Sequence, residues 1–178
     1  MRILKYLLIL PLLAITSIIN AQDPSGSITI IGGSSVNFYV NSLKKWDEGI
    51  TLEGWSRIRL RFDDPAPVTT LGWALNVKAE TLGIISDSGS SDMDLNTLEI
   101  RAISIDVISG SYTGTATPQM VALNNNYIEL LSDTQISNVD LIVTISYDLG
   151  TKLTNKLLAN EPGFYFVDLR FQLISDDI

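Results

Sequence analysis

The residues of this chain that could do chemistry are carboxylates, arginines and aromatic side chains, because its 178 residues include no histidine and no cysteine. Serine-histidine-aspartate and cysteine-histidine catalysis are therefore excluded, as are typical zinc sites and haem ligation through these residues. A glycosidase would need two acids across a cleft at roughly 5–10 Å, and no pair among the acids forms a recognisable constellation. The sequence predicts no enzyme, no catalytic residue and no cofactor.

An acidic loop is the one candidate metal site. Asp87, Asp92 and Asp94 could offer carboxylate oxygens to calcium, since hard cations prefer several oxygen ligands. The loop lacks the glycine and the terminal glutamate of the twelve-residue helix-loop-helix calcium pattern. Two interpretations are open, a weak calcium site and a solvated turn rich in Asp and Ser, and the composition favours the turn.

Two tryptophans are candidates for binding sugars. Trp46 and Trp55 flank a short predicted helical turn and the start of a strand, where a partly exposed ring could stack on a sugar. Trp73 begins a series of inward-facing residues and is expected in the core. A carbohydrate-binding module is therefore the alternative function.

A cationic stripe lies on one predicted strand, where Arg57, Arg59 and Arg61 alternate with apolar residues. The stripe could meet an acidic protein partner or a second copy of this acidic chain. It could instead pair across strands with acids such as Glu99 or Asp168, each pair contributing a few tenths of a kcal/mol. Structural pairing is the favoured interpretation.

The elements that must position these residues are strands, and the clearest runs from Gly163 to Ile174. Its two-residue apolar repeat is typical of a strand with one buried face, and Pro162 before it supplies a turn. Because so long a strand would otherwise leave many backbone groups unpaired, we expect it in the sheet interior, holding the C-terminal end in place. Its apolar side comprises Tyr165, Val167, Leu169, Phe171 and Leu173.

The remaining segments predict an all-β fold, an antiparallel β-sandwich of the immunoglobulin-like or pilin-like type with about eight to ten strands. Residues 41–49 predict one short helical turn, and a change of apolar phase predicts a bulge near Ala102 and Ile103. Asn124 to Asn126 predict a tight hairpin between residues 120–123 and 127–131. Other expected strands are 28–31, 36–40, 55–62, 72–79, 98–107 and 139–147.

The predicted core combines inward-facing residues from five of these strands. The second long alternating strand, Val139 to Tyr147, is expected to be central in one sheet beside the closing strand. The predicted core residues are Phe38, Ile58, Leu60, Trp73, Leu75, Val77, Leu141, Val143, Ile145, Val167, Leu169 and Phe171.

The N-terminal end has the three parts of a secretory signal peptide: positive residues, a short apolar run and a small residue, Ala21, at the expected cut. Residues 1–21 are therefore predicted to be removed, which leaves 22–178 as a single β-sandwich domain without a membrane span. Loss of Arg2 and Lys5 leaves ten basic against twenty acidic residues, or −10. This charge argues against nucleic acid and anionic membranes and suits the periplasm, the cell surface or the extracellular space.

Two segments carry a resemblance. Gly163 and Tyr165, followed by alternating residues, resemble the closing strand of bacterial fimbrial and spore-coat-like β-sandwich domains. The strand that begins at Trp73, with Gly49 ahead of it, is similar to a strand of small exported bacterial surface proteins, mostly of unknown role. The resemblance implies a secreted or cell-surface, non-enzymatic protein with a structural or adhesive role, which binds a partner or a second copy.

Overall fold

The computed structural model describes residues 23–65, 70–89, 92–114, 120–152 and 156–177. The predicted signal peptide, residues 1–21, lies outside these ranges. Among the described residues, no helix has both the length and the apolar character needed to cross a bilayer.

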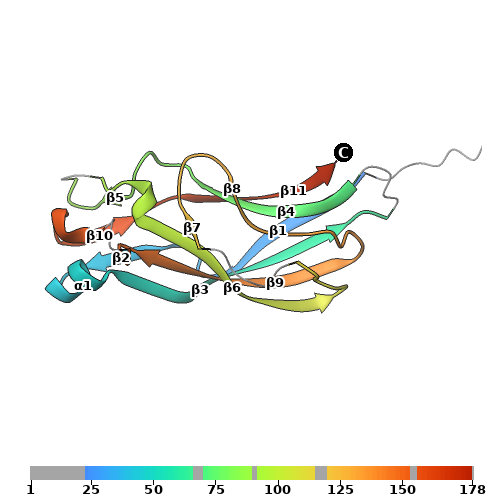
Figure 1. Ribbon diagram of the computed structural model, residues 1–178, viewed down its shortest axis with the longest axis horizontal. Coiled ribbons are helices and arrows are strands. Elements are labelled where there is room, and N and C mark those ends of the chain that lie inside the picture. Colours follow the sequence, from blue (N-terminus) through green and yellow to red (C-terminus); the bar gives the residue numbers. More distant parts are fainter. Residues whose placement is uncertain (1–22, 66–69, 90–91, 115–119, 153–155, 178) are drawn as a thin grey trace, which may run out of the picture.

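The chain is an all-β antiparallel sandwich, as predicted, built from three sheets in two layers (Figure 1). Sheet A has the strand order β1-β3-β9-β6-β7, sheet B the order β2-β10-β5, and sheet C the order β11-β4-β8. Sheets B and C follow one another along the layer that faces sheet A. The bounds are β1 (Ser25–Gly32), β2 (Asn37–Val40), α1 (Leu43–Glu48), β3 (Ile50–Asp63), β4 (Thr70–Ala79), β5 (Ile85–Ser86), β6 (Leu98–Ser109), β7 (Val121–Ala122), β8 (Ile128–Asp133), β9 (Val139–Leu149), β10 (Gly163–Phe166) and β11 (Leu169–Asp177), with 3₁₀ turns η1 (Leu95–Thr97) and η2 (Leu157–Ala159).

Strand β9 is central, as predicted, with β3 on one side and β6 on the other. Its inward residues Leu141, Val143 and Ile145 are fully buried between the layers. Ten of the twelve predicted core residues are buried, whereas Leu169 and Phe171 are half-buried and pack against the core from its margin.

The closing strand differs from the prediction. It is broken at Val167 and Asp168 into β10, which is central in sheet B, and β11, which is an edge strand of sheet C. Among the described strands, β11 is hydrogen-bonded to β4 alone. Tyr165 on β10 is fully buried, but the inward residues of β11 are half-buried. The expectation that β9 and the whole closing strand are central together in one sheet is wrong.

The predicted hairpin at Asn124 is also wrong. Strand β7 pairs with β6 in sheet A, whereas β8 pairs with β4 in sheet C. Two backbone hydrogen bonds of 2.9 Å hold the connection. Leu123 N donates to Leu98 O of sheet A, and Ala79 N of sheet C donates to Asn124 O. The asparagine turn therefore crosses between layers.

Two local predictions hold. The register of β6 against β9 shifts between Ala102 and Ser104, which is the predicted bulge. Helix α1 is a short turn with Ser42 as its N-cap and Gly49, at φ 81°, as its C-cap. Leu43 at its start is 80% exposed.

Candidate functional site

A cavity of about 200 Å³ lies where the two layers part near the β1 edge. One wall is the loop between β1 and β2, and the other is the break between β10 and β11. The interruption of the closing strand therefore borders the cavity. Its lining includes Ile30, Ser34, Ser35, Asn37, Ser56, Ile58, Tyr147, Phe166, Asp168 and Phe171.

The loop wall is fixed by hydrogen bonds from β3. Trp55 Nε1 donates to Ser35 O at 2.8 Å, and Ser56 Oγ donates to Gly33 O at 2.6 Å. Gly33 has φ 62°, and a Cβ atom there would lie 2.1 Å from Trp55 O. The loop thus needs glycine for both its left-handed backbone and its close approach to β3.

The floor of the cavity is a buried hydroxyl chain. Tyr147 OH donates to Ser56 Oγ at 2.9 Å, and Ser56 Oγ in turn donates to Gly33 O. Burial raises the pKa of Tyr147 to about 12, so its hydroxyl stays protonated and acts as a donor at neutral pH. All three groups are satisfied within the protein, so they shape the cavity and leave ligand recognition to its mouth.

The mouth combines polar and aromatic groups. Asn37 stands directly opposite Phe166 in the β2-β10 register, so their side chains share the outer face of sheet B. Asp168 follows in the strand break and is exposed. An amide, a carboxylate and an aromatic ring therefore meet at one opening.

An aromatic row extends from this mouth across the outer face of sheet B and consists of Phe166, Phe164 and Tyr39. Phe164 and Tyr39 are opposite one another in the register, and their rings stack with centroids 4.2 Å apart and planes 12° apart. The three side chains are 37%, 48% and 45% exposed, respectively. Lys45 Nζ donates to Tyr39 O at 2.8 Å and lies 5.4 Å from the centre of the Tyr39 ring.

The predicted tryptophans do not form a joint site. Trp46 is half-buried against the core, and its buried Nε1 has no hydrogen-bond partner among the described residues. Trp55 is 46% exposed and supports the cavity loop. The contribution of Phe164 and Phe166 to an aromatic row with Tyr39 was not predicted, although both share the outward phase of the closing strand with Asp168.

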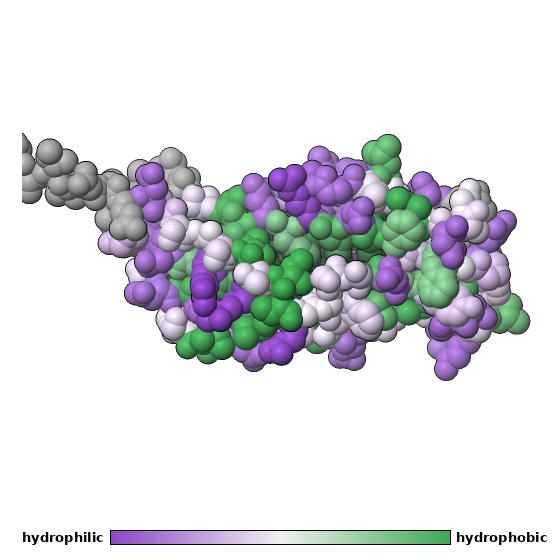
Figure 2. Space-filling view, turned by 180° about the vertical axis from the view of Figure 1, so that it is seen from behind, coloured by the Kyte–Doolittle hydropathy of each residue, from purple (hydrophilic) through white to green (hydrophobic). Residues whose placement is uncertain are grey.

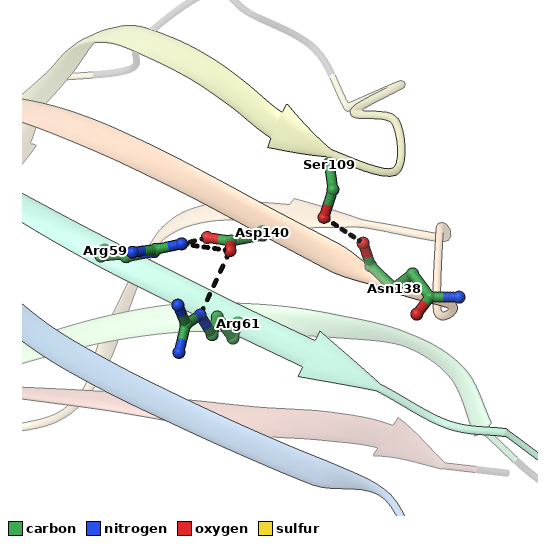
Figure 3. A network of polar contacts seen from close by, with 5 residues as sticks. All are labelled: Arg59, Arg61, Ser109, Asn138 and Asp140. Atoms are coloured by element: carbon green, nitrogen blue, oxygen red, sulfur yellow. Dashed lines mark hydrogen bonds and ion pairs between the residues drawn. The ribbon is translucent and has the colours of Figure 1, made fainter.

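Arg59 and Arg61 of the arginine stripe share one acidic partner, which is not one of the acids expected. Asp140 on β9 accepts from Arg59 Nε at 2.8 Å and from Arg61 Nε at 3.2 Å (Figure 3). Hydrogen bonding from Arg59 lowers the pKa of Asp140 to about 2. Arg57 forms no ion pair within the part of the chain that the structure describes. Pairing with Glu99 or Asp168 is wrong because neither acid lies on a strand next to β3.

Glu99 belongs to a second cluster on the outer face of sheet A. It lies opposite Asp148 in the β6-β9 register, and both side chains are 3% exposed. Lys152 pairs with Glu99, while Arg101 Nε lies 3.3 Å from Asp148 Oδ2, an ion pair without aligned hydrogen-bond geometry. Thr51 also donates to Asp148. Each carboxylate therefore has its own cation, which makes the cluster structural.

The acidic loop has a structural contact. Asp87 Oδ1 accepts from Phe164 N at 3.0 Å, which ties the loop to β10. Asp92 and Asp94 lie on either side of Met93, which forms a bridge to Ile84. Within the described ranges, no group of three or more acidic side chains is placed to hold a metal ion.

Strand β1 leaves a second exposed feature, an open sheet edge. It pairs with β3 on one side and, in the described part of the chain, has no strand on the other. Ile30 and Ile31 are each 46% exposed, and the half-buried Leu173 of β11 lies against Gly26. Seen from behind, hydrophobic surface gathers in the middle of the face on which β1 and β11 lie in contact (Figure 2).

Comparison with known proteins gives little. No family model matches the chain, and no curated protein does. Among solved structures, the chain is similar to a family 123 glycoside hydrolase from Clostridium perfringens, with a TM-score of 0.34 and 13% identity over 86% of this chain and 25% of that chain. A match this weak shows neither a shared fold nor a shared activity. The fimbrial or spore-coat-like resemblance stays a prediction.

Proposed function

We propose that this protein is exported, is not an enzyme, and has a structural or adhesive role at the cell surface, where β1 pairs with β1 of a second copy. The observation that carries the proposal is the composition of this edge. Ser25–Gly32 contains no charged residue, although the chain has a net charge of −8. Natural proteins usually protect long edge strands with charges, prolines or strong twists.

The other sheet edges in the described residues are protected. Strands β5 and β7 have two residues each and β2 has four. Strand β11 carries Arg170 and Asp176, and β8 carries Glu129 and Asp133. Because acidic surfaces repel one another, two copies would approach most easily along an uncharged strand. An antiparallel β1-β1 contact is self-complementary, as a two-fold interface requires.

Sedimentation velocity on residues 22–178 tests this proposal. The protein should self-associate as its concentration rises, more strongly at high salt because screening weakens the repulsion between copies. Ile31→Lys should abolish association, whereas Leu82→Lys, at a 91% exposed loop position, should not. A chain that stays monomeric throughout, or Ile31→Lys that associates like the parent, would contradict the proposal.

Export is tested separately. Protein recovered from the periplasmic or surface fraction should begin at Gln22. Recovery of the uncleaved chain in the inner membrane would overturn this part of the proposal.

The second candidate function is a carbohydrate-binding module. Exposed aromatic rings beside hydrogen-bonding groups are the observation that favours it, since such rings can stack on the apolar face of a sugar. These rings are Tyr39, Phe164 and Phe166, in place of the predicted Trp46 and Trp55.

A further inference from the structure

The exposed rings of the aromatic row are not needed to fill the core of the fold. Strands β2 and β10 have four residues each, and their inward residues Phe38, Val40 and Tyr165 already fill the core. The three further rings, on the outward face, remain 37–48% exposed. Aromatic side chains that stay this exposed are more typical of a contact surface than of a core.

Two of the three rings are held by contacts within the protein before any ligand arrives. Tyr39 is held between the Phe164 ring and the Lys45 ammonium group, and Asp87 binds the backbone of Phe164. Preorganised rings lose little conformational freedom on binding, which favours affinity.

The groups around the rings indicate the chemistry of the ligand. Asn37 and Asp168 provide an amide and a carboxylate at the cavity mouth next to Phe166, while Asp87 lies beside Phe164. Amide and carboxylate groups hydrogen-bond to hydroxyls, and the rings need an apolar face to stack on. A pyranose offers both, with C–H groups on its faces and hydroxyls on its perimeter.

The volume of the cavity and the charges around the row further restrict the class of sugar. The cavity, at about 200 Å³, is smaller than the roughly 300–1,000 Å³ typical of sites for drug-sized ligands, so it suits one sugar ring. Asp87 and Asp168 flank the row in a chain of net charge −8, which disfavours sulfated or uronic sugars.

We propose that the outer face of sheet B binds a neutral oligosaccharide, with one sugar at the cavity mouth against Phe166, Asn37 and Asp168 and the next sugar against the Phe164 ring. This inference rests on the second proposed function and locates its site. The cavity shares Ile30 with β1, but the aromatic row lies on strands of the other layer.

The test is isothermal titration of residues 22–178 with neutral hexasaccharides of glucose, xylose, mannose and N-acetylglucosamine, together with oligogalacturonate as a charged ligand. At least one neutral hexasaccharide should bind, and Phe164→Ala and Phe166→Ala should each weaken it about tenfold or more. Asp168→Asn should weaken it less, while Phe164→Tyr should retain binding.

The matched control is Tyr127→Ala, which removes a 37% exposed ring that also lies under a lysine, Lys78, on another strand. It should leave binding unchanged, and each variant should keep a cooperative thermal transition. Binding that survives both phenylalanine variants would overturn the site but keep the carbohydrate function. Binding of no neutral hexasaccharide, or of oligogalacturonate alone, would overturn both.

Discussion

Strand β9 and the closing segment β10–β11 have the same apolar alternation but different places in the fold. Strand β9 has a hydrogen-bonded neighbour on each side, whereas β11 has β4 alone. On β9 even the outward residues Ser146 and Asp148 are buried, while Arg170 on β11 is exposed. The apolar alternation of a sequence thus indicates which face of a strand is buried. The burial of the outward polar groups indicates how central the strand is in its sheet.

Truncation would separate the two halves of the closing segment and should give the largest effect. A chain that ends at Pro162 loses central β10 and its buried Tyr165, and we expect no cooperative folding. A chain that ends at Asp168 loses only the edge strand β11 and should still fold, with a lower thermal midpoint and a tendency to aggregate along the exposed edge of β4. Calorimetry on both chains would measure this, and equal behaviour would remove the distinction between β10 and β11.

A matched pair of leucine substitutions would compare β9 and β11 directly. Leu141→Ala on β9 removes a fully buried side chain and should lower the free energy of unfolding by about 2–5 kcal/mol. Leu173→Ala on β11 removes a half-buried one and should lower it by about 1 kcal/mol. Urea denaturation would measure both, and similar losses would show that β11 is as tightly packed as β9.

The buried acids Glu99 and Asp148 allow a third comparison. It is between an arginine that has an acidic partner and an arginine that has none. Arg101→Met leaves Asp148 without its cation and beside Glu99, and should cost about 1–3 kcal/mol. The full 3–5 kcal/mol of a buried pair is not expected, because Arg101 is 31% exposed. Arg57→Met is the control and should stay within about 0.5 kcal/mol, measured by the same denaturation. Equal losses would contradict a structural role for the cluster.

Much of the fold could be predicted because face burial is a local property. The alternation in β3 and β9 identified their inward residues, and the phase change at Ala102 identified the bulge. Strand order could not be predicted, since it depends on which strands meet in space. The asparagine turn at 124 has the composition of a hairpin and yet crosses between sheets.

The candidate site was less predictable for the same reason. Asp140 meets Arg59 only through the register of β3 against β9, which no local pattern encodes. The cavity lies at Val167 and Asp168, where the closing strand is interrupted, but the apolar alternation of the sequence continues through that break. Phe164 and Phe166 did carry a signal, because they occupy the outward phase of the closing strand, where Asp168, Arg170 and Gln172 follow them.

The smallest expected effect concerns the arginine stripe, where the pKa of Asp140 is lowered to about 2 from roughly 3.9 in an unfolded chain. A lowered folded-state pKa stabilises the protein above the unfolded value, and this contribution is lost as the pH falls through about 2. The difference in thermal midpoint between the parent and Asp140→Asn should therefore be full above about pH 4 and shrink towards zero near pH 2. Other carboxylates are common to both chains and largely cancel in the difference.

Arg59→Gln should reproduce the loss because it removes the main donor, whereas Arg57→Gln should behave like the parent. A difference that stays constant from pH 7 to pH 2 would show that the Arg59 and Arg61 contacts do not stabilise the ionised carboxylate, and the stripe would again be free to meet an acidic partner.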